Sequence, residues 1–446
     1  CKLNQSESDH MARRLSEVGV KLVPFGEPAD LCLINSCTVT HIGDRKSRHL
    51  IRQAVRSNPE AFVAVAGCYA ELEADAVAKI QGVDAVVGNR GKDRLVELLR
   101  ERGLELGMNP GAAAVPECGE DAALSSGGDL KPLGRTRAFV KIQEGCDNCC
   151  SYCIVPQARG EGRSRSADEI VREIRELDAE GCQEVVLTGV NITAYGRDRS
   201  LADSGRSARG MGLYGLLERL LRETGVPRLR LSSLQPEEWD PRFYDLWQSG
   251  RLCRQLHFSL QSGSDGVLRR MRRRYNVDRY RRIAAEARDA LQGVAITTDV
   301  IAGFPGETDA EQAETEIFLR EIGFAGLHVF KYSPRTGTVA AEMAGQVDPR
   351  VKQERSQRLI DLGTEMGDAF RSGFVGSVLS VLWEERVDES EAARLLQDRA
   401  EDPCWTGLSD NYIRVYARSQ REIAGTIAGV RVERLVQEGV AGATLR

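Results

Sequence analysis

Three cysteines lie close together in a short polar stretch in the first half of the chain. Cys146, Cys150 and Cys153 follow the pattern C-x3-C-x2-C. Thiolates at this spacing on one loop can bind three irons of a 4Fe-4S cube and leave the fourth iron open to a substrate or cofactor. Zinc is the alternative, but a closed zinc site needs four ligands, and this pattern supplies three plus the irregular Cys149. The spacing therefore favours an iron-sulfur site.

Three more cysteines lie where an α/β fold would gather them. In residues 1–103, helical periodicity alternates with short apolar runs, which predicts an open parallel sheet with helices on its faces. Ligands collect at the carboxyl ends of strands in such sheets. Cys37 and Cys68 each follow an apolar run, and Cys1 would follow a first strand that we expect to be missing from a truncated N-terminus. Spacing alone leaves open whether the three are a second ligand set or packed core thiols.

The rest of the chain predicts two further domains. Residues 135–368 alternate apolar runs with helical stretches, as in a partial α/β, TIM-like barrel with active-site loops at the strand ends. Residues 104–134 are rich in Gly and Pro and predict an interdomain linker. Residues 370–446 contain short β-rich segments separated by glycines, which predicts a small antiparallel β-barrel. The polar loop 196–212 has no periodicity and predicts a surface insertion.

Composition is that of an ordinary globular protein. The 446 residues are 41% hydrophobic and carry a net charge of -5, which allows two or three domains with sizeable cores. No apolar run reaches the length of about 18 residues that a membrane helix needs, and no basic and apolar leader is present. We therefore expect a cytoplasmic protein without a membrane partner, in which the twelve cysteines favour metal ligation over disulfides.

One basic segment stands out from this acidic average. Residues 269–282 contain eight arginines and a single acid, Asp278. Such a stripe suits phosphates, so we predict RNA contacts at Arg270, Arg273 and Arg274. The alternative is a solvated helix surface whose arginines pair with acids of the same chain.

These motifs resemble the methylthiotransferase branch of the radical S-adenosylmethionine (SAM) superfamily. The resemblance covers nearly the whole chain and departs from the family at loop 196–212, at Cys149 and at the missing N-terminus. The C-terminal segment is similar to the TRAM domain of many tRNA-modifying enzymes, with a purely structural barrel as the alternative. The matching stretches are residues 135–165, Cys1-Lys2-Leu3-Asn4-Gln5-Ser6-Glu7-Ser8, Asn35-Ser36-Cys37-Thr38-Val39-Thr40 and Ala66-Gly67-Cys68-Tyr69-Ala70.

The resemblance implies SAM and two 4Fe-4S clusters as cofactors. Cys146, Cys150 and Cys153 would be the catalytic ligands of the cluster that binds SAM. The auxiliary cluster, which would carry sulfur, would be held by Cys1, Cys37 and Cys68. Tyr152 matches the aromatic position near the adenine. Turns after the predicted strands would hold the rest of SAM through Gly189, Asn191, Ser233, Gln261 and Gly303.

The implied reaction starts with hydrogen abstraction by a 5'-deoxyadenosyl radical and ends with sulfur delivery from the auxiliary cluster. The motifs are most similar to the type that adds a methylthio group to C2 of N6-threonylcarbamoyladenosine next to the anticodon of tRNA. An electron donor such as flavodoxin or ferredoxin would be a partner. Isopentenyladenosine in tRNA and a ribosomal protein are the alternative substrates. A non-catalytic, metal-containing RNA-binding module is the alternative from another class.

Overall fold

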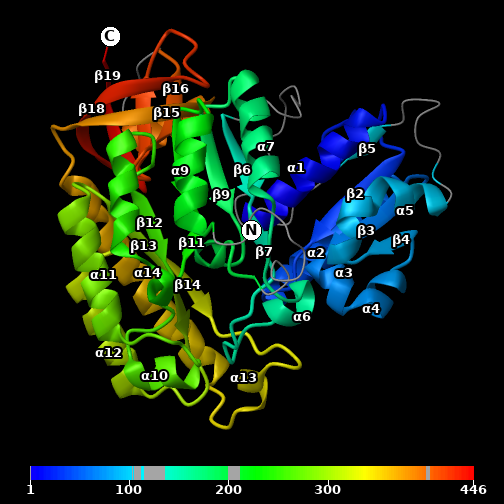
Figure 1. Cartoon of the computed structure of the whole chain (residues 1–446), viewed down its shortest axis with the longest axis horizontal. Helices are drawn as coiled ribbons and strands as arrows, with labels where there is room; N and C mark the ends of the chain where they lie inside the picture. Colours follow the sequence, from blue (N-terminus) through cyan, green and yellow to red (C-terminus); the bar gives the residue numbers. More distant parts are fainter. Residues whose placement is uncertain are drawn as a thin grey trace.

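The computed structural model describes residues 2–102, 104, 112–114, 136–198, 211–397 and 402–445. Its N-terminal α/β part (blue), central α/β part (green to yellow) and C-terminal β-barrel (orange to red) follow one another along the chain in Figure 1. The predicted α/β class with a small terminal barrel is thereby confirmed. Cys1, most of the predicted linker 104–134 and most of the predicted insertion 196–212 lie outside the described residues. No helix in the described ranges combines the length and apolar character of a membrane span.

The N-terminal part is a parallel sheet with the strand order β1-β5-β2-β3-β4. Helices cover both of its faces, so β2 and β3 are buried along almost their whole length, which is why they stand out as continuous apolar runs. Strand β5 was not predicted and lies inside the expected linker, because a run of alanines carries little β-strand signal. The strands are β1 (Lys21–Leu22), β2 (Leu31–Ser36), β3 (Phe62–Gly67), β4 (Ala85–Val87) and β5 (Ala112–Ala114).

Two separate cores cover the faces of this sheet. The helices α1 and α5 pack on one face through residues such as Met11 and Leu99. The helices α2, α3 and α4 pack on the other face through residues such as Ile51 and Val77. Because the strands of this sheet pair in parallel, their carboxyl ends meet at one edge. The helices are α1 (Lys2–Glu17), α2 (His41–Ser57), α3 (Cys68–Leu72), α4 (Ala74–Ala78) and α5 (Leu95–Glu101), with the short helix η1 (Asn89–Arg94).

The central part is a curved parallel sheet in two adjoining pieces, ordered β10-β9-β6 and β11-β12-β13-β14. The predicted alternation of strands and helices is present throughout it. The strands are β6 (Arg137–Lys141), β9 (Glu184–Thr188), β10 (Arg228–Leu231), β11 (Ser233–Leu234), β12 (Gln255–Phe258), β13 (Ala295–Ala302) and β14 (Gly326–Lys331). The outer helices include α7 (Ala167–Ala179), α9 (Leu213–Glu223), α10 (Asp265–Arg270), α11 (Val277–Ala290), α12 (Asp309–Ile322) and α14 (Pro349–Ser372).

The two faces of this curved sheet differ in polarity. Val185, Leu229 and Leu256 belong to the apolar core shared with the outer helices. Since side chains alternate along a strand, Glu184 and His257 lie on the opposite, inner face. Helix α1 of the N-terminal part runs beside β6 and β9 (Figure 1). The inner face is therefore polar and partly lined by the N-terminal part.

The C-terminal part is a closed barrel ordered β15-β16-β17-β19-β18. Its strand pairs are antiparallel as predicted, except that β17 and β19 run parallel where the barrel closes. The buried Arg228 of β10 donates to the carbonyl oxygens of Ser380 and Leu408, which fixes the barrel against the central sheet. The strands are β15 (Val378–Arg386), β16 (Cys404–Ser409), β17 (Arg414–Arg418), β18 (Ile427–Val436) and β19 (Gly439–Thr444), with helix α15 (Glu389–Leu396) between the first two.

Candidate functional site

Cys146, Cys150 and Cys153 lie on one loop that follows the short strand β7 (Gln143–Glu144). Burial raises the pKa of Cys146 to about 11 and that of Cys153 to about 12, and the neighbouring thiols of the loop add to both shifts. The structure therefore holds the three predicted ligands on one short loop, where burial favours the thiol form of Cys146 and Cys153. Metal binding would release their protons, because only thiolates bind iron.

The loop is held at both ends. Gly145 has φ +70°, and a Cβ at this position would lie 1.9 Å from the carbonyl oxygen of Glu161, so glycine is required. Further along, the Ser151 backbone N–H donates to the Met271 carbonyl oxygen at 3.1 Å, and the Ser151 hydroxyl donates to that of Arg270 at 2.8 Å. These contacts fix the cysteines against the segment that follows α10.

The residues present fit a 4Fe-4S cluster. The Asn148 backbone N–H lies 3.4 Å from the Cys146 Sγ, and an Arg273 guanidinium N–H donates to the Cys150 Sγ at 3.2 Å. Donors of this kind stabilise cluster thiolates. Within the described ranges, no group of three His, Cys, Asp or Glu side chains is arranged so that it could hold a single metal ion. A 4Fe-4S cube binds each thiolate to a different iron. The fourth cysteine of the loop, Cys149, is exposed and lies outside this set.

The arginine segment is folded differently from the prediction. The side chain of Arg273 is only 3% exposed and donates to the Cys150 Sγ, because its loop turns this side chain inward. The RNA contact at Arg273 stays a prediction. Arg270 donates to both carboxylate oxygens of Glu311 at 2.9 and 2.8 Å, as in the alternative of internal pairing. Arg274 is exposed on the same loop.

The residues predicted to contact SAM lie in turns along the carboxyl edge of the central sheet. A Cβ on Gly189, which follows β9, would lie 2.8 Å from the Gln143 carbonyl oxygen. Gly303 follows β13 with φ +73°, and Gln261 follows β12 with φ +70°. Ser233 begins β11. The fold thus gathers these turns at one edge, where ligands bind in such sheets.

Two side chains of this set have defined neighbours. The Tyr152 ring packs edge to face on Phe304, the residue after Gly303, with ring centroids 6.5 Å apart. The Asn191 amide donates to the Glu238 carboxylate at 3.1 Å and accepts from Thr193 at 2.6 Å. Tyr152 therefore joins the cysteine loop to the turn after β13, whereas the Asn191 side chain is already committed to protein partners.

The N-terminal cysteines lie in adjacent turns. Cys37 follows β2 and Cys68 begins α3, directly after β3. The turns approach so closely that a Cβ on Gly67, at φ +102°, would lie 2.4 Å from the Ser36 carbonyl oxygen. The Cys68 Sγ accepts a hydrogen bond from the Asn89 amide at 3.5 Å. Two of the three predicted auxiliary ligands thus lie at the predicted edge of the sheet.

The two cysteine sites are neighbours across the junction of the N-terminal and central parts. The Asn89 amide, which contacts Cys68, also donates to the Ala158 carbonyl oxygen at 2.6 Å. Ala158 belongs to α6 (Val155–Arg159), which begins two residues after Cys153. On the Cys37 side, Arg335 of the central part forms an ion pair of 2.6 Å with Asp44.

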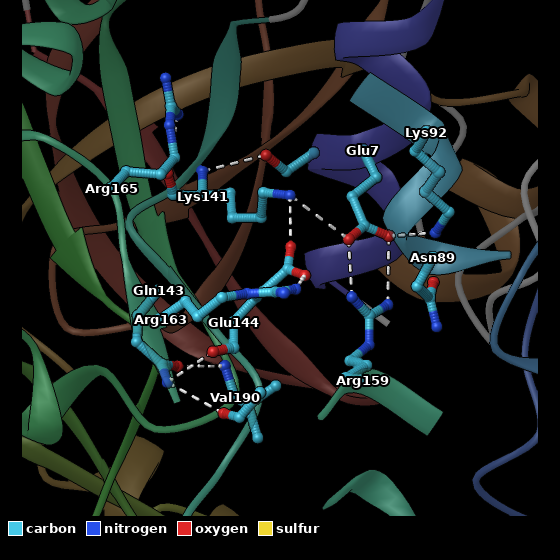
Figure 2. A network of polar contacts seen from close by, with 12 residues as sticks. Glu7, Asn89, Lys92, Lys141, Gln143, Glu144, Arg159, Arg163, Arg165 and Val190 are labelled. Atoms are coloured by element: carbon cyan, nitrogen blue, oxygen red, sulfur yellow. Dashed lines mark hydrogen bonds and ion pairs between the residues drawn. The ribbon is translucent and has the colours of Figure 1, made fainter. Parts of the chain in front are cut away.

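A buried ion network lies beside this junction, centred on Glu7 of α1 (Figure 2). Its carboxylate forms ion pairs with Lys92 and Arg159 at 2.6 Å each and with Lys141 at 3.6 Å. Burial raises the pKa of Glu7, but Lys92 and Arg159 outweigh it and hold the pKa well below its usual range. Sequence reasoning gave these residues no role. A sequence signal existed for two of them, because Glu7 on α1 and Arg159 on α6 are charged residues at helix positions that face the protein interior.

The inner face of the central sheet carries a second polar cluster. The carboxylate of Asp299 on β13 lies 3.2 Å from the His257 ring and 3.7 Å from the His328 ring. Burial raises the pKa of Asp299, but His257 outweighs it and the net shift is downward. The interior that faces the strand-end turns is thus polar on β12, β13 and β14.

Comparisons with known proteins agree with this arrangement. Residues 140–319 match the sequence profile of the Radical SAM superfamily, and residues 1–88 match that of uncharacterized protein family UPF0004. The chain is 37% identical to the threonylcarbamoyladenosine tRNA methylthiotransferase MtaB of Bacillus subtilis (strain 168), over 97% of its own length and 92% of that protein. It is 38% identical to the tRNA-2-methylthio-N(6)-dimethylallyladenosine synthase of Parafrankia sp. (strain EAN1pec), over 90% of its own length and 80% of that protein.

A solved structure supports the fold. The radical S-adenosylmethionine methyltransferase TsrM from Kitasatospora setae, with cobalamin and a [4Fe-4S] cluster bound, has a TM-score of 0.50 at 17% identity. The match covers 75% of this chain and 68% of that chain. At this identity the similarity describes the fold alone.

Proposed function

The chain belongs to the radical SAM methylthiotransferase family, and on this premise we propose that it adds a methylthio group to C2 of N6-threonylcarbamoyladenosine beside the anticodon of tRNA. Relatives of 37%, 35% and 33% identity carry the name of that activity. The cysteine motifs, which resemble the same type, also support this choice of nucleoside. A low-potential electron donor such as flavodoxin or ferredoxin is part of the proposal.

One observation carries the proposal, namely that two cysteine sites lie next to each other. Asn89 contacts the thiol of Cys68 and the backbone of the helix that follows Cys153. Cys146, Cys150 and Cys153 would hold a 4Fe-4S cluster with SAM, and Cys37 and Cys68 would hold a second cluster together with Cys1. When bound, these groups supply a 5'-deoxyadenosyl radical and the sulfur that joins the substrate carbon.

The chain's own residues would position the reactants. Tyr152, packed against the turn after β13, would lie beside the adenine of SAM. The turns at Gly189 and Gly303 would present their backbone groups to SAM. Glycine is needed to form them, because a Cβ would lie 2.8 Å from the Gln143 carbonyl oxygen in the first and 2.4 Å from the Lys352 side chain in the second.

The polar inner face favours the threonylcarbamoyl substrate. A carbamoyl and threonyl side group needs hydrogen-bond partners, which His257, Asp299 and His328 offer. An isopentenyl group would be better served by apolar walls. Because a relative of 38% identity is named for dimethylallyladenosine, that nucleoside is the second candidate.

The test is to incubate the reconstituted protein, SAM and reductant with tRNA or with ribosomal protein from cells that lack this gene, and to measure the nucleosides and the protein by mass spectrometry. We expect a methylthio mass gain on threonylcarbamoyladenosine, 5'-deoxyadenosine release, and about eight irons per chain. Cys146→Ala is the control and should abolish both products. A gain on isopentenyladenosine alone, or on ribosomal protein, would refute the substrate. Binding of tRNA without 5'-deoxyadenosine release would indicate a non-catalytic module.

A further inference from the structure

Glu7 ties α1 to η1 and α6 through its ion pairs with Lys92 and Arg159 (Figure 2). It lies on α1, which begins at Lys2 and so follows Cys1 directly in the sequence. Two arginine nitrogens of Arg159 lie 2.6 and 3.1 Å from its carboxylate oxygens, and Lys92 lies 2.6 Å away. The side chains of Glu7, Lys92 and Arg159 are each 4% exposed. A bidentate pair at this depth fixes orientation as well as distance.

Asn89 adds a second link from the same short helix as Lys92. Its amide nitrogen lies 3.5 Å from the Cys68 Sγ and 2.6 Å from the carbonyl oxygen of Ala158. Its backbone N–H donates to the Glu71 carboxylate at 2.7 Å, which holds η1 against α3. The helix α6 is therefore tied to the Cys68 turn through Asn89 and to α1 through Arg159. The same helix follows the loop of Cys146, Cys150 and Cys153.

We propose that Asn89, Glu7 and Arg159 are positioning residues that set the separation of the two cysteine sites, and so couple radical formation to sulfur transfer. The inference rests on the proposed two-site function. Once a substrate radical has formed, sulfur must be within bonding reach of the carbon, and a shift of about 1 Å can reduce the rate about 100-fold. Radical formation needs only the site of Cys146, Cys150 and Cys153, so a changed separation should affect transfer and leave SAM cleavage intact.

The test compares the wild-type holoenzyme with Asn89→Leu, Asn89→Asp and Glu7→Gln. The ratio of 5'-deoxyadenosine to methylthiolated product should rise between about tenfold and about 100-fold in the variants, while 5'-deoxyadenosine formation stays near the wild-type rate. Pulsed electron paramagnetic resonance of the two reduced clusters gives a readout that does not depend on turnover. We expect a broadened or displaced distance distribution in Asn89→Leu. Asn89→Asp keeps the shape of the side chain but cannot donate to the thiolate, so it should also shift the auxiliary cluster spectrum.

Glu184→Gln is the matched control. Its carboxylate is buried in an ion pair of 2.6 Å with Arg230, at the opposite end of β9 from the cysteine loop. This variant should lose stability without a change in the product ratio. If Glu7→Gln does not fold, the two Asn89 variants decide, since they leave the ion network intact.

The outcomes separate the inference from the function it rests on. A wild-type ratio and an unchanged cluster distance in both Asn89 variants would overturn the inference while the proposed function stands. A wild-type protein that binds one cluster, or that makes no methylthiolated product, would overturn the proposed function and the inference with it.

Discussion

The guanidinium of Arg273 donates a hydrogen bond to the Sγ of Cys150 at 3.2 Å. The guanidinium also makes a cation-π contact with the Tyr275 ring, whose centroid lies 4.8 Å from the guanidinium carbon. The side chain is almost fully buried, so its charge is weakly screened by solvent. A cation fixed at this thiolate favours the more negative, reduced state of a bound cluster.

Replacing Arg273 by methionine should lower the reduction potential of the SAM-binding cluster. A hydrogen bond to a charged group contributes about 1.5–3 kcal/mol. For one-electron reduction, a tenfold change in the equilibrium is about 59 mV, so the decrease should reach at least about this value. A redox titration followed by electron paramagnetic resonance measures it. Arg274→Met, an exposed neighbour, is the control, and equal potentials in all three proteins would contradict the prediction.

Cys149 should be dispensable for cluster binding, whereas Cys150 should not. Cys149 is exposed, while Cys150 receives the Arg273 hydrogen bond. We expect Cys149→Ser to keep the wild-type iron content and rate of 5'-deoxyadenosine formation. Cys150→Ser should lose about four irons and all SAM cleavage. Iron analysis and product quantification decide, and the reverse pattern would assign the ligand to Cys149.

Glu7 should make the protein sensitive to acid. Its folded-state pKa is depressed below the unfolded value of about 4.3, so its stabilisation is present above that pH and is lost as the pH falls. Glu7→Gln should cost about 3–5 kcal/mol at pH 7, because Lys92 and Arg159 lose their buried partner. Urea unfolding from pH 7 to pH 3 should show the gap to wild type narrowing below about pH 4. A gap that does not change with pH would contradict the depressed pKa.

Arg272 and Arg274 should contact tRNA phosphates. Both are exposed on the loop that also carries Arg273 to the cysteine site. Alanine at each position should weaken tRNA binding for all sequences and reduce the slope of log affinity against log salt by about 1. Arg270→Ala is the control, because that arginine is paired with Glu311. Fluorescence anisotropy over a salt series measures the slopes. A larger loss of tRNA affinity in Arg270→Ala than in the Arg272 and Arg274 variants would place the RNA contact elsewhere.

The sequence alone was sufficient for features that depend on neighbouring residues. The spacing of Cys146, Cys150 and Cys153 reflects a single loop, and the structure brings these thiols together. Apolar runs predicted β2 and β3 of the N-terminal sheet, because strands covered on both faces are continuously apolar. The positions of Cys37 and Cys68 followed from the same rule, since parallel strands end at a common edge.

Only the tertiary structure decided contacts between distant segments. In the sequence, nothing distinguishes the roles of Arg270, Arg273 and Arg274. Packing turned Arg273 toward Cys150 and paired Arg270 with Glu311. The strand β5 forms although three alanines carry little local preference, because β1 and β2 supply its hydrogen-bond partners. Asn89 meets Ala158 across 69 positions of the chain. Residue spacing determines which ligands one loop or strand can supply. The contact between two sites on distant segments depends on how whole domains pack.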